Sequence, residues 1–501
     1  MDFLTNISLG FSVALTPLNV LYAMLGAIVG TSIGVLPGLG APATVALLLP
    51  VSYGMEPASA IILMAGIFSG AMYGCSTTSI LLNIPGEAAS VVTCMDGYQM
   101  ARNGQAGPAL GMSAIGSFIG ATISILMLTF VAPAVAELAL DFGPAEYSSL
   151  ILLGLIMSVY LGGESILKGL IMIVFGLILA VIGLDPVYGA PRLTFGLPYM
   201  FEGVDFVVAT MGLFGIAEVL TNLESPESRE IYKTSIKGLM PNLEDWKRCW
   251  RPILRGSLLG FLVGVLPGGG ATIGSFISYA MEKKISKHPQ RFGSGAIEGV
   301  AGPESANNAA AQSSFIPLLT LGIPGNATIA MIFVALMIHG IQPGPMLLVE
   351  HPKLFWGVIA SMYVGNLMLL GLNLPLIGFW VRLLKLPYHY MAVAIVIICI
   401  IGAYSIKNSA FDIGVMIVFG VVGYLLRKGG YPAAPLVLAM ILGRILERSV
   451  QQALKVSGAD LAIFIEKPIS AALLAVGVLV MLIPLGKWIW KRFLVSQESV
   501  S

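Results

Sequence analysis

The chain has 501 residues, of which 57% are hydrophobic and 11% are charged, and its mean hydropathy is +0.90. Soluble domains carry about 25% charged residues, so this composition excludes a water-soluble globular protein and predicts a protein embedded in lipid. The net charge of +1 comes without a basic stripe, which argues against a nucleic-acid partner.

The first 222 residues are predicted to form an N-terminal transmembrane repeat. Residues Met1–Asn6 contain no Lys or Arg, and no A-x-A cleavage site follows, so we expect insertion without removal of a leader. A re-entrant helical hairpin is expected near residues 20–50. It is interrupted at Leu36-Pro-Gly-Leu-Gly40, because proline removes a helical hydrogen bond and glycine permits left-handed backbone. About five crossings follow, and Asn83-Ile-Pro-Gly86 marks a second interruption.

Residues 223–252 are predicted to form a cytoplasmic linker. Seven Lys and Arg residues lie between Arg229 and Arg255, and such residues accumulate in short cytoplasmic loops. The basic chain end, Lys487-Trp-Ile-Trp-Lys-Arg492, is assigned to the cytoplasm for the same reason. Counting crossings back from these loops places the N-terminus on the periplasmic side.

Residues 253–455 are predicted to form a second transmembrane repeat. A hairpin at 256–282 has basic residues at both ends and the interruption Leu266-Pro-Gly-Gly-Gly270 in its middle, so both ends are assigned to the cytoplasm. Five crossings are then expected, at about 300–338, 354–380, 388–406, 411–426 and 431–450. Residues 456–501 supply a terminal helix and a cytoplasmic tail.

The two halves repeat each other in sequence. Gly34-Val-Leu-Pro-Gly38 returns as Gly264-Val-Leu-Pro-Gly268, Ile84-Pro-Gly86 as Ile323-Pro-Gly325, and Met172-Ile-Val-Phe-Gly176 as Met416-Ile-Val-Phe-Gly420. Odd numbers of crossings per half make the repeats inverted, as in many secondary transporters. If both hairpins were full crossings, the repeats would be parallel and the basic loop 283–291 would lie outside; the positive-inside rule favours the inverted arrangement.

The expected fold is therefore an all-α polytopic membrane protein. It has two inverted-topology repeats, each with a re-entrant helical hairpin and about five crossings, plus a C-terminal helix. Each helix that resumes after an interruption begins with unpaired N–H groups and a partial positive charge, which attract an anion without Lys or Arg.

Polar residues follow the interruptions, Glu87 among them. Their short hydroxyls and amides can donate to a carboxylate, while their oxygens or the preceding carbonyls could hold Na⁺. The residues predicted to contact substrate are Pro37, Gly38, Gly40, Thr44, Pro85, Gly86, Ser90, Pro267, Gly268, Gly270, Thr272, Ser275, Asn307, Asn308, Pro324, Gly325, Asn326 and Thr328. The alternative for each Ser, Thr and Asn is that it only caps its half-helix.

The stretch Gly302-Pro-Glu-Ser-Ala-Asn-Asn-Ala-Ala-Ala-Gln312 is unusually polar for a membrane crossing. Polar side chains inside a membrane are costly and mark functional sites. The residues predicted to hold a coupling ion, Na⁺ or H⁺, are Thr77, Ser79, Asn83, Glu304, Gln312 and Thr320. No catalytic residue, cofactor or other metal site is expected, because the four His residues form no H-E-x-x-H pattern and no P-loop is present.

The motifs at 299–311 (Gly-Val-Ala-Gly-Pro-Glu-Ser-Ala-Asn-Asn-Ala-Ala-Ala) and at Thr320-Leu-Gly-Ile-Pro-Gly325, with the paired Val-Leu-Pro-Gly segments, resemble the TctA family. These are the large membrane subunits of tripartite tricarboxylate transporters, and the resemblance covers nearly the whole chain. The positions that match the family's motifs are the Pro-Gly interruptions, Glu304, Asn307, Asn308 and the Gly-Ile-Pro-Gly segment.

This resemblance implies a multi-pass protein of the bacterial inner membrane with two partners. One is a small TctB-like membrane subunit, and the other is a TctC-like periplasmic substrate-binding protein. The family imports citrate and related di- or tricarboxylates by symport with an ion rather than by ATP hydrolysis. Analogy with other inverted-repeat carriers suggests elevator-like alternating access. A passive anion channel is the alternative function, and whether the chain forms a homodimer is left open.

Overall fold

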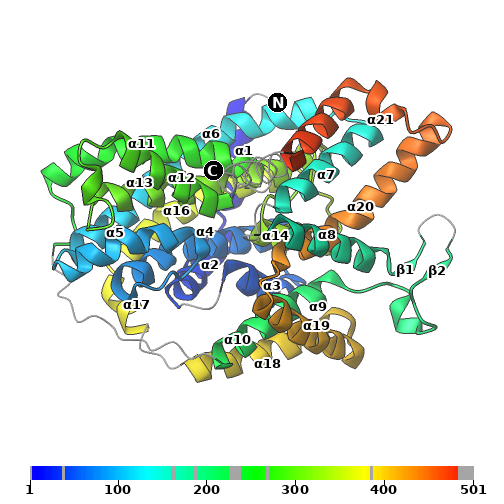
Figure 1. Ribbon diagram of the computed structural model, residues 1–501, viewed down its shortest axis with the longest axis horizontal. Coiled ribbons are helices and arrows are strands. Elements are labelled where there is room, and N and C mark those ends of the chain that lie inside the picture. Colours follow the sequence, from blue (N-terminus) through cyan, green and yellow to red (C-terminus); the bar gives the residue numbers. More distant parts are fainter. Residues whose placement is uncertain are drawn as a thin grey trace, which may run out of the picture. The chain divides into compact units, whose positions relative to one another are not determined.

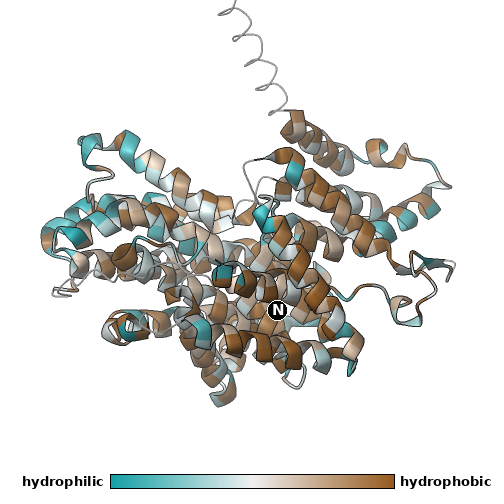
Figure 2. Cartoon of the chain, turned by 60° about the horizontal axis from the view of Figure 1, so that its bottom comes forward, coloured by the Kyte–Doolittle hydropathy of each residue, from teal (hydrophilic) through white to brown (hydrophobic). Residues whose placement is uncertain are grey.

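A computed structural model describes residues 3–36, 40–159, 165–185, 189–224, 238–266, 270–383 and 388–482. Within these ranges most residues are helical, and the strands are those of one two-stranded antiparallel sheet, β1 (Gly183–Leu184) and β2 (Pro191–Arg192) (Figure 1). Hydrophobic residues cover most of the helices (Figure 2). The prediction of an all-α polytopic membrane protein is confirmed.

Seven of the described helical segments are long and apolar enough to cross a membrane. They are Pro17–Val35, Pro57–Leu82, Ala106–Ala139, Phe206–Glu224, Pro352–Asn373, His389–Lys407 and Ala410–Lys428. Six shorter apolar helices accompany them, among them Pro144–Ser158, Ile166–Val181 and Pro468–Leu482. The segment predicted as a crossing at 431–450 is helical but is not among the seven.

The chain forms two compact units, and each combines residues from both predicted repeats. Unit 1 comprises Met1–Leu140 and Asp205–Gly429, and unit 2 comprises Asp141–Val204 and Gly430–Ser501. Compactness depends on which helices touch, whereas a repeat is defined by sequence order, so the two divisions need not coincide. The predicted repeat boundaries, linker and tail stay predictions.

Unit 1 is built from two similar runs of helices. The first run is α1 (Phe3–Ala14), α2 (Pro17–Val35), α3 (Ala41–Ser52), α4 (Pro57–Leu82), η1 (Ala88–Ser90), α5 (Val91–Arg102) and α6 (Ala106–Ala139). The chain returns to unit 1 with α9 (Phe206–Thr210), the π-helical η4 (Met211–Ile216) and α10 (Ala217–Glu224).

The second run is α11 (Leu243–Val265), α12 (Gly270–Ile285), η5 (Pro289–Arg291), α13 (Glu298–Ser313), the π-helical η6 (Pro317–Leu321), α14 (Ala327–Ile338), α15 (Met346–Glu350), α16 (Pro352–Asn373), α17 (Ile377–Leu383), α18 (Tyr388–Lys407) and α19 (Ala410–Lys428). Pro375 separates α16 from α17 within the expected crossing 354–380, because proline lacks the N–H that would continue the helix. Helix α1 was not anticipated from the sequence.

Unit 2 contains α7 (Pro144–Ser158), α8 (Ile166–Val181), the β1–β2 sheet, η3 (Pro198–Met200), α20 (Ala433–Ser457), α21 (Ile463–Glu466) and the helix Pro468–Leu482. Helix α20 packs against α7 and α8. A Cβ atom at Gly176 of α8 would lie 2.4 Å from the carbonyl oxygen of Leu436 in α20. The two helices therefore approach closely enough to require glycine at this position.

Matching rows of glycines hold together two helix pairs of unit 1. In the α2–α4 pair, Cβ atoms at Gly26, Gly30 and Gly34 would lie 2.3, 2.2 and 2.4 Å from the carbonyl oxygens of Leu63, Ile67 and Ala71. In the α11–α13 pair, Cβ atoms at Gly256, Gly260 and Gly264 would lie 2.3, 2.1 and 2.3 Å from those of Gly302, Ala306 and Ala310. Small residues at this four-residue spacing let membrane helices pack backbone to backbone. The sequence repeat thus coincides with a repeated mode of packing, while its inverted orientation stays a prediction.

The helices end at the predicted interruptions. Helix α4 is capped by Asn83 and η6 by Gly322, both with left-handed backbone (φ 59° and 68°) and both followed by Ile-Pro-Gly. Helices α2 and α11 end at Val35 and Val265. Pro37, Gly38, Pro267 and Gly268, which are predicted site residues, lie outside the described residues.

Candidate functional site

A carboxylate with no exposed surface, that of Glu304, lies inside unit 1 on helix α13. It accepts a hydrogen bond from the Ser76 hydroxyl of α4 at 2.6 Å and a short one from the Thr93 hydroxyl of α5. The Ser117 hydroxyl of α6 donates to it at 3.4 Å. Four helices therefore converge on one acidic side chain.

Small residues of α13 allow these helices to come so close. Gly120 of α6 faces the Ser305 carbonyl oxygen, where a Cβ atom would lie 2.3 Å away, and Gly260 of α11 faces that of Ala306. Alanines at 306, 309, 310 and 311 continue the same narrow helix. With backbones in contact, the polar side chains of α13 have no room to reach solvent and must find partners inside the bundle.

The Glu304 carboxylate has hydroxyl partners but no counter-charge. Among the described residues, no Lys, Arg or His forms an ion pair with it. An uncompensated charge buried in a low-dielectric interior costs several kcal/mol even after relaxation. The arrangement is therefore suited to a carboxyl group that is protonated or that binds a cation.

Two amide oxygens follow Glu304 along the same face of α13. Asn308 Nδ2 donates to Ser117 Oγ at 2.8 Å and to the Glu304 carbonyl at 3.1 Å, and Gln312 Nε2 donates to Ser69 Oγ at 2.9 Å. The oxygens Asn308 Oδ1 and Gln312 Oε1 are buried and have no hydrogen-bond partner. An unsatisfied buried acceptor costs about 1–3 kcal/mol, and hard cations prefer oxygen ligands of this kind. We call Glu304, Asn308 and Gln312, with their hydroxyl partners, the α13 polar row.

The two interruptions of the first run meet at Glu87. Its carboxylate accepts a short hydrogen bond from the N–H of Ala41, the first residue of α3. Gly86 packs on the end of α2, where a Cβ atom would lie 2.1 Å from the Gly34 carbonyl oxygen. The positive, N-terminal end of the α3 dipole therefore faces the carboxyl group of Glu87, which belongs to the chain itself.

Several predicted contact residues bond to their own helices. Thr44 donates to the Gly40 carbonyl, Ser275 to that of Thr272 and Thr320 to that of Ile316, while the Asn326 side chain accepts from the N–H of Ile329. Ser79 donates to Ser90, which donates to the Glu87 carbonyl. Asn326 therefore caps α14, as the capping alternative states. Thr44, Ser275 and Thr320 instead donate to carbonyl oxygens three or four residues earlier in the chain. Substrate contact by these residues stays a prediction.

The structure brings only part of the predicted set together. Buried residues of the set are Thr44, Thr77, Ser79, Gly86, Ser90, Gly270, Ser275, Glu304, Asn307, Asn308, Gln312, Thr320, Pro324, Gly325 and Thr328; Gly40, Thr272 and Asn326 are half-buried, and Asn83 and Pro85 are exposed. Two members from different helices, Ser79 of α4 and Ser90 of η1, are joined by a hydrogen bond. The partners of Glu304 from α4, α5 and α6 lie outside the predicted set.

Sequence reasoning missed the hydroxyl partners Thr93, Ser117 and Ser69. A signal for them exists, because Ser69 and Ser76 are seven residues apart on α4, and Ser117 and Ser124 are seven apart on α6. Ser124 donates to the Ala309 carbonyl of α13 at 2.7 Å. Seven residues are about two helical turns, so each pair lies on one face, the face that meets α13.

Ion pairs outside the α13 polar row join α11 to α12 and to α13. Arg255 of α11 binds Glu282 of α12 with a shortest distance of 2.5 Å, and Arg248 of α11 binds Glu298 of α13 at 2.8 Å. The hydrogen bonds that Arg248 donates to the Glu298 carboxylate raise the pKa of Arg248. The buried Asp96 of α5 accepts three backbone N–H groups of the loop before α13, each at 2.8 Å.

These features define a multi-pass membrane protein with broken helices and a polar site enclosed by them. The chain matches the model of the tripartite tricarboxylate transporter TctA family over residues 20–438, and it belongs to that family. This family is one of transporter subunits rather than of enzymes.

Two relatives from Agrobacterium vitis are similar to the chain. An uncharacterised 52.8 kDa protein of the TAR-I ttuC′ 3′ region is 50% identical over 485 residues, 97% of each chain. An uncharacterised protein of the TAR-II ttuC′ 3′ region is 53% identical over 226 residues, 45% of this chain and 93% of the relative. No solved structure matches the chain.

Proposed function

We propose that this chain is the large membrane subunit of a secondary transporter of the bacterial inner membrane. It imports a small di- or tricarboxylate by symport with Na⁺ or H⁺, after a periplasmic binding protein has delivered the substrate. A small membrane subunit completes the assembly. Membership of the TctA family supports the class of transporter.

The observation that carries the proposal is the α13 polar row. Glu304 supplies a buried negative charge without a counter-charge, and Asn308 and Gln312 supply buried oxygens without donors. A transported cation at this row would neutralise the Glu304 charge and bind the amide oxygens of Asn308 and Gln312. A transported proton would neutralise the Glu304 charge. The free energy of ion binding is then linked to the packing of α4, α5, α6 and α13, which is how an ion gradient can drive a conformational change.

For the substrate, we propose the N-terminus of α3 as one anion site. The Glu87 carboxylate occupies it in the described conformation, and a substrate carboxylate would replace Glu87 there. Exchange of one carboxylate for another avoids leaving the N–H of Ala41 unpaired. The subsequent movement of the hairpin-bearing helices against the rest of the bundle would be elevator-like.

The first experiment measures uptake of labelled mono-, di- and tricarboxylates by cells that express all three components. Na⁺ and proton gradients are collapsed in turn. We expect one carboxylate to accumulate and its accumulation to vanish with one gradient only. Equilibration without accumulation would instead support a passive anion channel.

The second arm replaces Glu304 by Gln, which keeps the size of the side chain and removes its charge. Glu304→Gln should abolish gradient-driven accumulation while the protein still inserts and assembles. Glu137→Gln is the matched control, because Glu137 is exposed on α6. Normal accumulation by Glu304→Gln would remove the α13 polar row from the coupling mechanism.

A further inference from the structure

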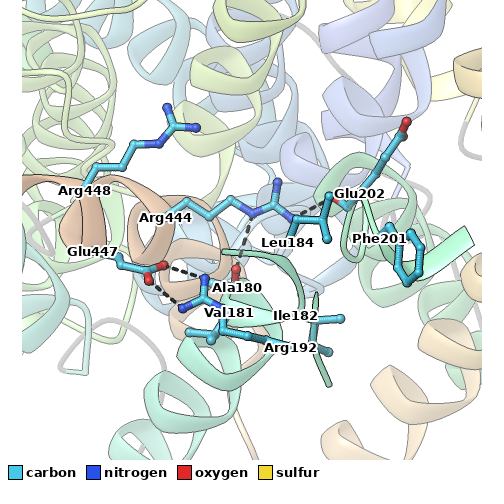
Figure 3. A pocket seen from close by; sticks show the side chains of 10 residues that line it. All are labelled: Ala180, Val181, Ile182, Leu184, Arg192, Phe201, Glu202, Arg444, Glu447 and Arg448. Carbon is cyan, nitrogen blue, oxygen red and sulfur yellow. Dashed lines mark hydrogen bonds and ion pairs between the residues drawn. The ribbon is translucent and has the colours of Figure 1, made fainter. Parts of the chain in front are cut away.

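A small pocket lined by three arginines lies within unit 2. Its volume is about 90 Å³, and Arg192 from β2 lines it together with Arg444 and Arg448 from α20 (Figure 3). The last turn of α8 forms another wall. Because α8 is apolar apart from Lys168 near its other end, the pocket would lie at the end of a membrane-embedded helix, where lipid head groups are found.

Two of the three arginines, Arg192 and Arg448, keep hydrogen-bond donors that the described residues do not use. Glu447 accepts two hydrogen bonds from Arg192, at 2.7 and 3.3 Å, and Asp185 lies 3.3 Å from the same guanidinium. The Nε atom of Arg192 is nevertheless buried without a hydrogen-bond partner. Arg448 forms no hydrogen bond or ion pair within the described part of the chain.

Arg444 joins the end of α8 and the segment after β2 to α20. Its Nε donates to the Ala180 carbonyl at 3.4 Å, and its Nη2 donates to the Glu202 carbonyl at 3.2 Å. In Figure 3 the Glu202 side chain extends away from the arginines, so Glu447 is the one carboxylate drawn among them.

The segment that follows β2 exposes a row of large apolar and aromatic side chains. The exposed fractions are 49% for Leu193, 79% for Phe195, 46% for Leu197 and 67% for Tyr199. Tyr199 has the apolar ring and polar edge of the side chains that gather at the level of lipid head groups, and the Leu and Phe side chains beside it could bury their apolar surface in the membrane. This segment leads directly into residues 201 and 202 of the pocket wall.

We propose that this pocket binds the phosphate group of an anionic phospholipid, with the segment 193–201 resting in the membrane interface beside it. Guanidinium groups recognise phosphate through paired, charge-assisted hydrogen bonds, and basic pockets beside membrane helices hold anionic head groups. The acyl chains would lie along the apolar surface next to α8. The exposed aromatic residues favour a lipid over a free phosphate ion, which needs no apolar contact.

The test uses the full-length chain purified in a mild detergent. Its thermal unfolding is followed while phosphatidylglycerol, phosphatidylcholine, glycerol 3-phosphate or inorganic phosphate is added. We expect phosphatidylglycerol to raise the melting temperature at concentrations at which the other three do not.

Variants locate the effect. Arg448→Gln should weaken the apparent affinity for phosphatidylglycerol about tenfold, because one charge-assisted contact is lost, and Phe195→Ser should weaken it less. Lys455→Gln is the matched control, since Lys455 is exposed on the same helix, and it should bind like the parent chain.

Three results would overturn the proposal. Equal stabilisation by inorganic phosphate would identify a site for a free anion. Unchanged lipid affinity of Arg448→Gln would remove the pocket from lipid binding. Loss of the small membrane subunit from Arg448→Gln and Phe195→Ser, with lipid affinity intact, would identify a protein interface.

Discussion

Replacing Gly30 by Ala should destabilise the protein, although alanine is the better helix former. A Cβ atom at Gly30 would lie 2.2 Å from the Ile67 carbonyl oxygen, whereas ordinary contact begins near 3.4 Å. The obstacle is backbone, which cannot rotate away, so α2 and α4 would have to separate by about 1 Å. Overpacking of this kind costs about 1–3 kcal/mol, which exceeds the propensity gain of at most about 1 kcal/mol.

The assay is thermal unfolding of the full-length chain in detergent, with Gly260→Ala as a second test on the α11–α13 pair. The control is Gly371→Ala on α16, where no atom lies within 4 Å of the added methyl group. We expect lower melting temperatures for the first two variants and an unchanged or higher one for the control. A melting temperature of Gly30→Ala equal to that of Gly371→Ala would refute the argument that backbone contact fixes these glycines.

Three further predictions concern the acidic residues. Glu304→Ala leaves the hydroxyls of three helices without their acceptor and should cost about 3 kcal/mol or more of unfolding free energy, measured as a lower melting temperature; stability equal to that of the parent chain would contradict the buried network. Glu87→Gln weakens the internal occupant of the α3 N-terminus and should lower the KM for the transported carboxylate several-fold in uptake assays; an unchanged KM would separate Glu87 from substrate binding. Asp96→Ala frees three backbone N–H groups and should speed amide exchange at residues 293–296, measured by hydrogen–deuterium exchange; unchanged protection there would show that other contacts hold the loop.

Local chemistry made the helix interruptions predictable. Asn83 and Gly322 adopt left-handed backbone ahead of Ile-Pro-Gly, and both proline and left-handed residues act on the few bonds around them. The same reasoning applied to Pro375 would have divided the expected crossing 354–380. Helix α1 was not predicted, because residues 3–14 have neither the flanking Lys or Arg nor the Pro-Gly interruption on which the other assignments rested.

The sequence predicted which residues of the α13 polar row are unusually polar, but it did not predict which side chains they contact. The sequence by itself marked Glu304, Asn308 and Gln312 as too polar for a membrane helix, because the cost of burying them depends on residue type alone. It could not name Thr93 or Ser117 as partners, since both lie about 190 or more residues away.

The amino-acid sequence thus determined the membrane class, the broken helices, the internal repeat and the family, all of which depend on composition or on short spacings along the chain. Tertiary structure alone decided that Glu87 faces the N-terminus of α3, that hydroxyls from three helices meet Glu304, and that arginines of β2 and α20 share one pocket. Such contacts depend on how closely whole helices approach, and that distance is set by the combined packing of residues far apart in sequence.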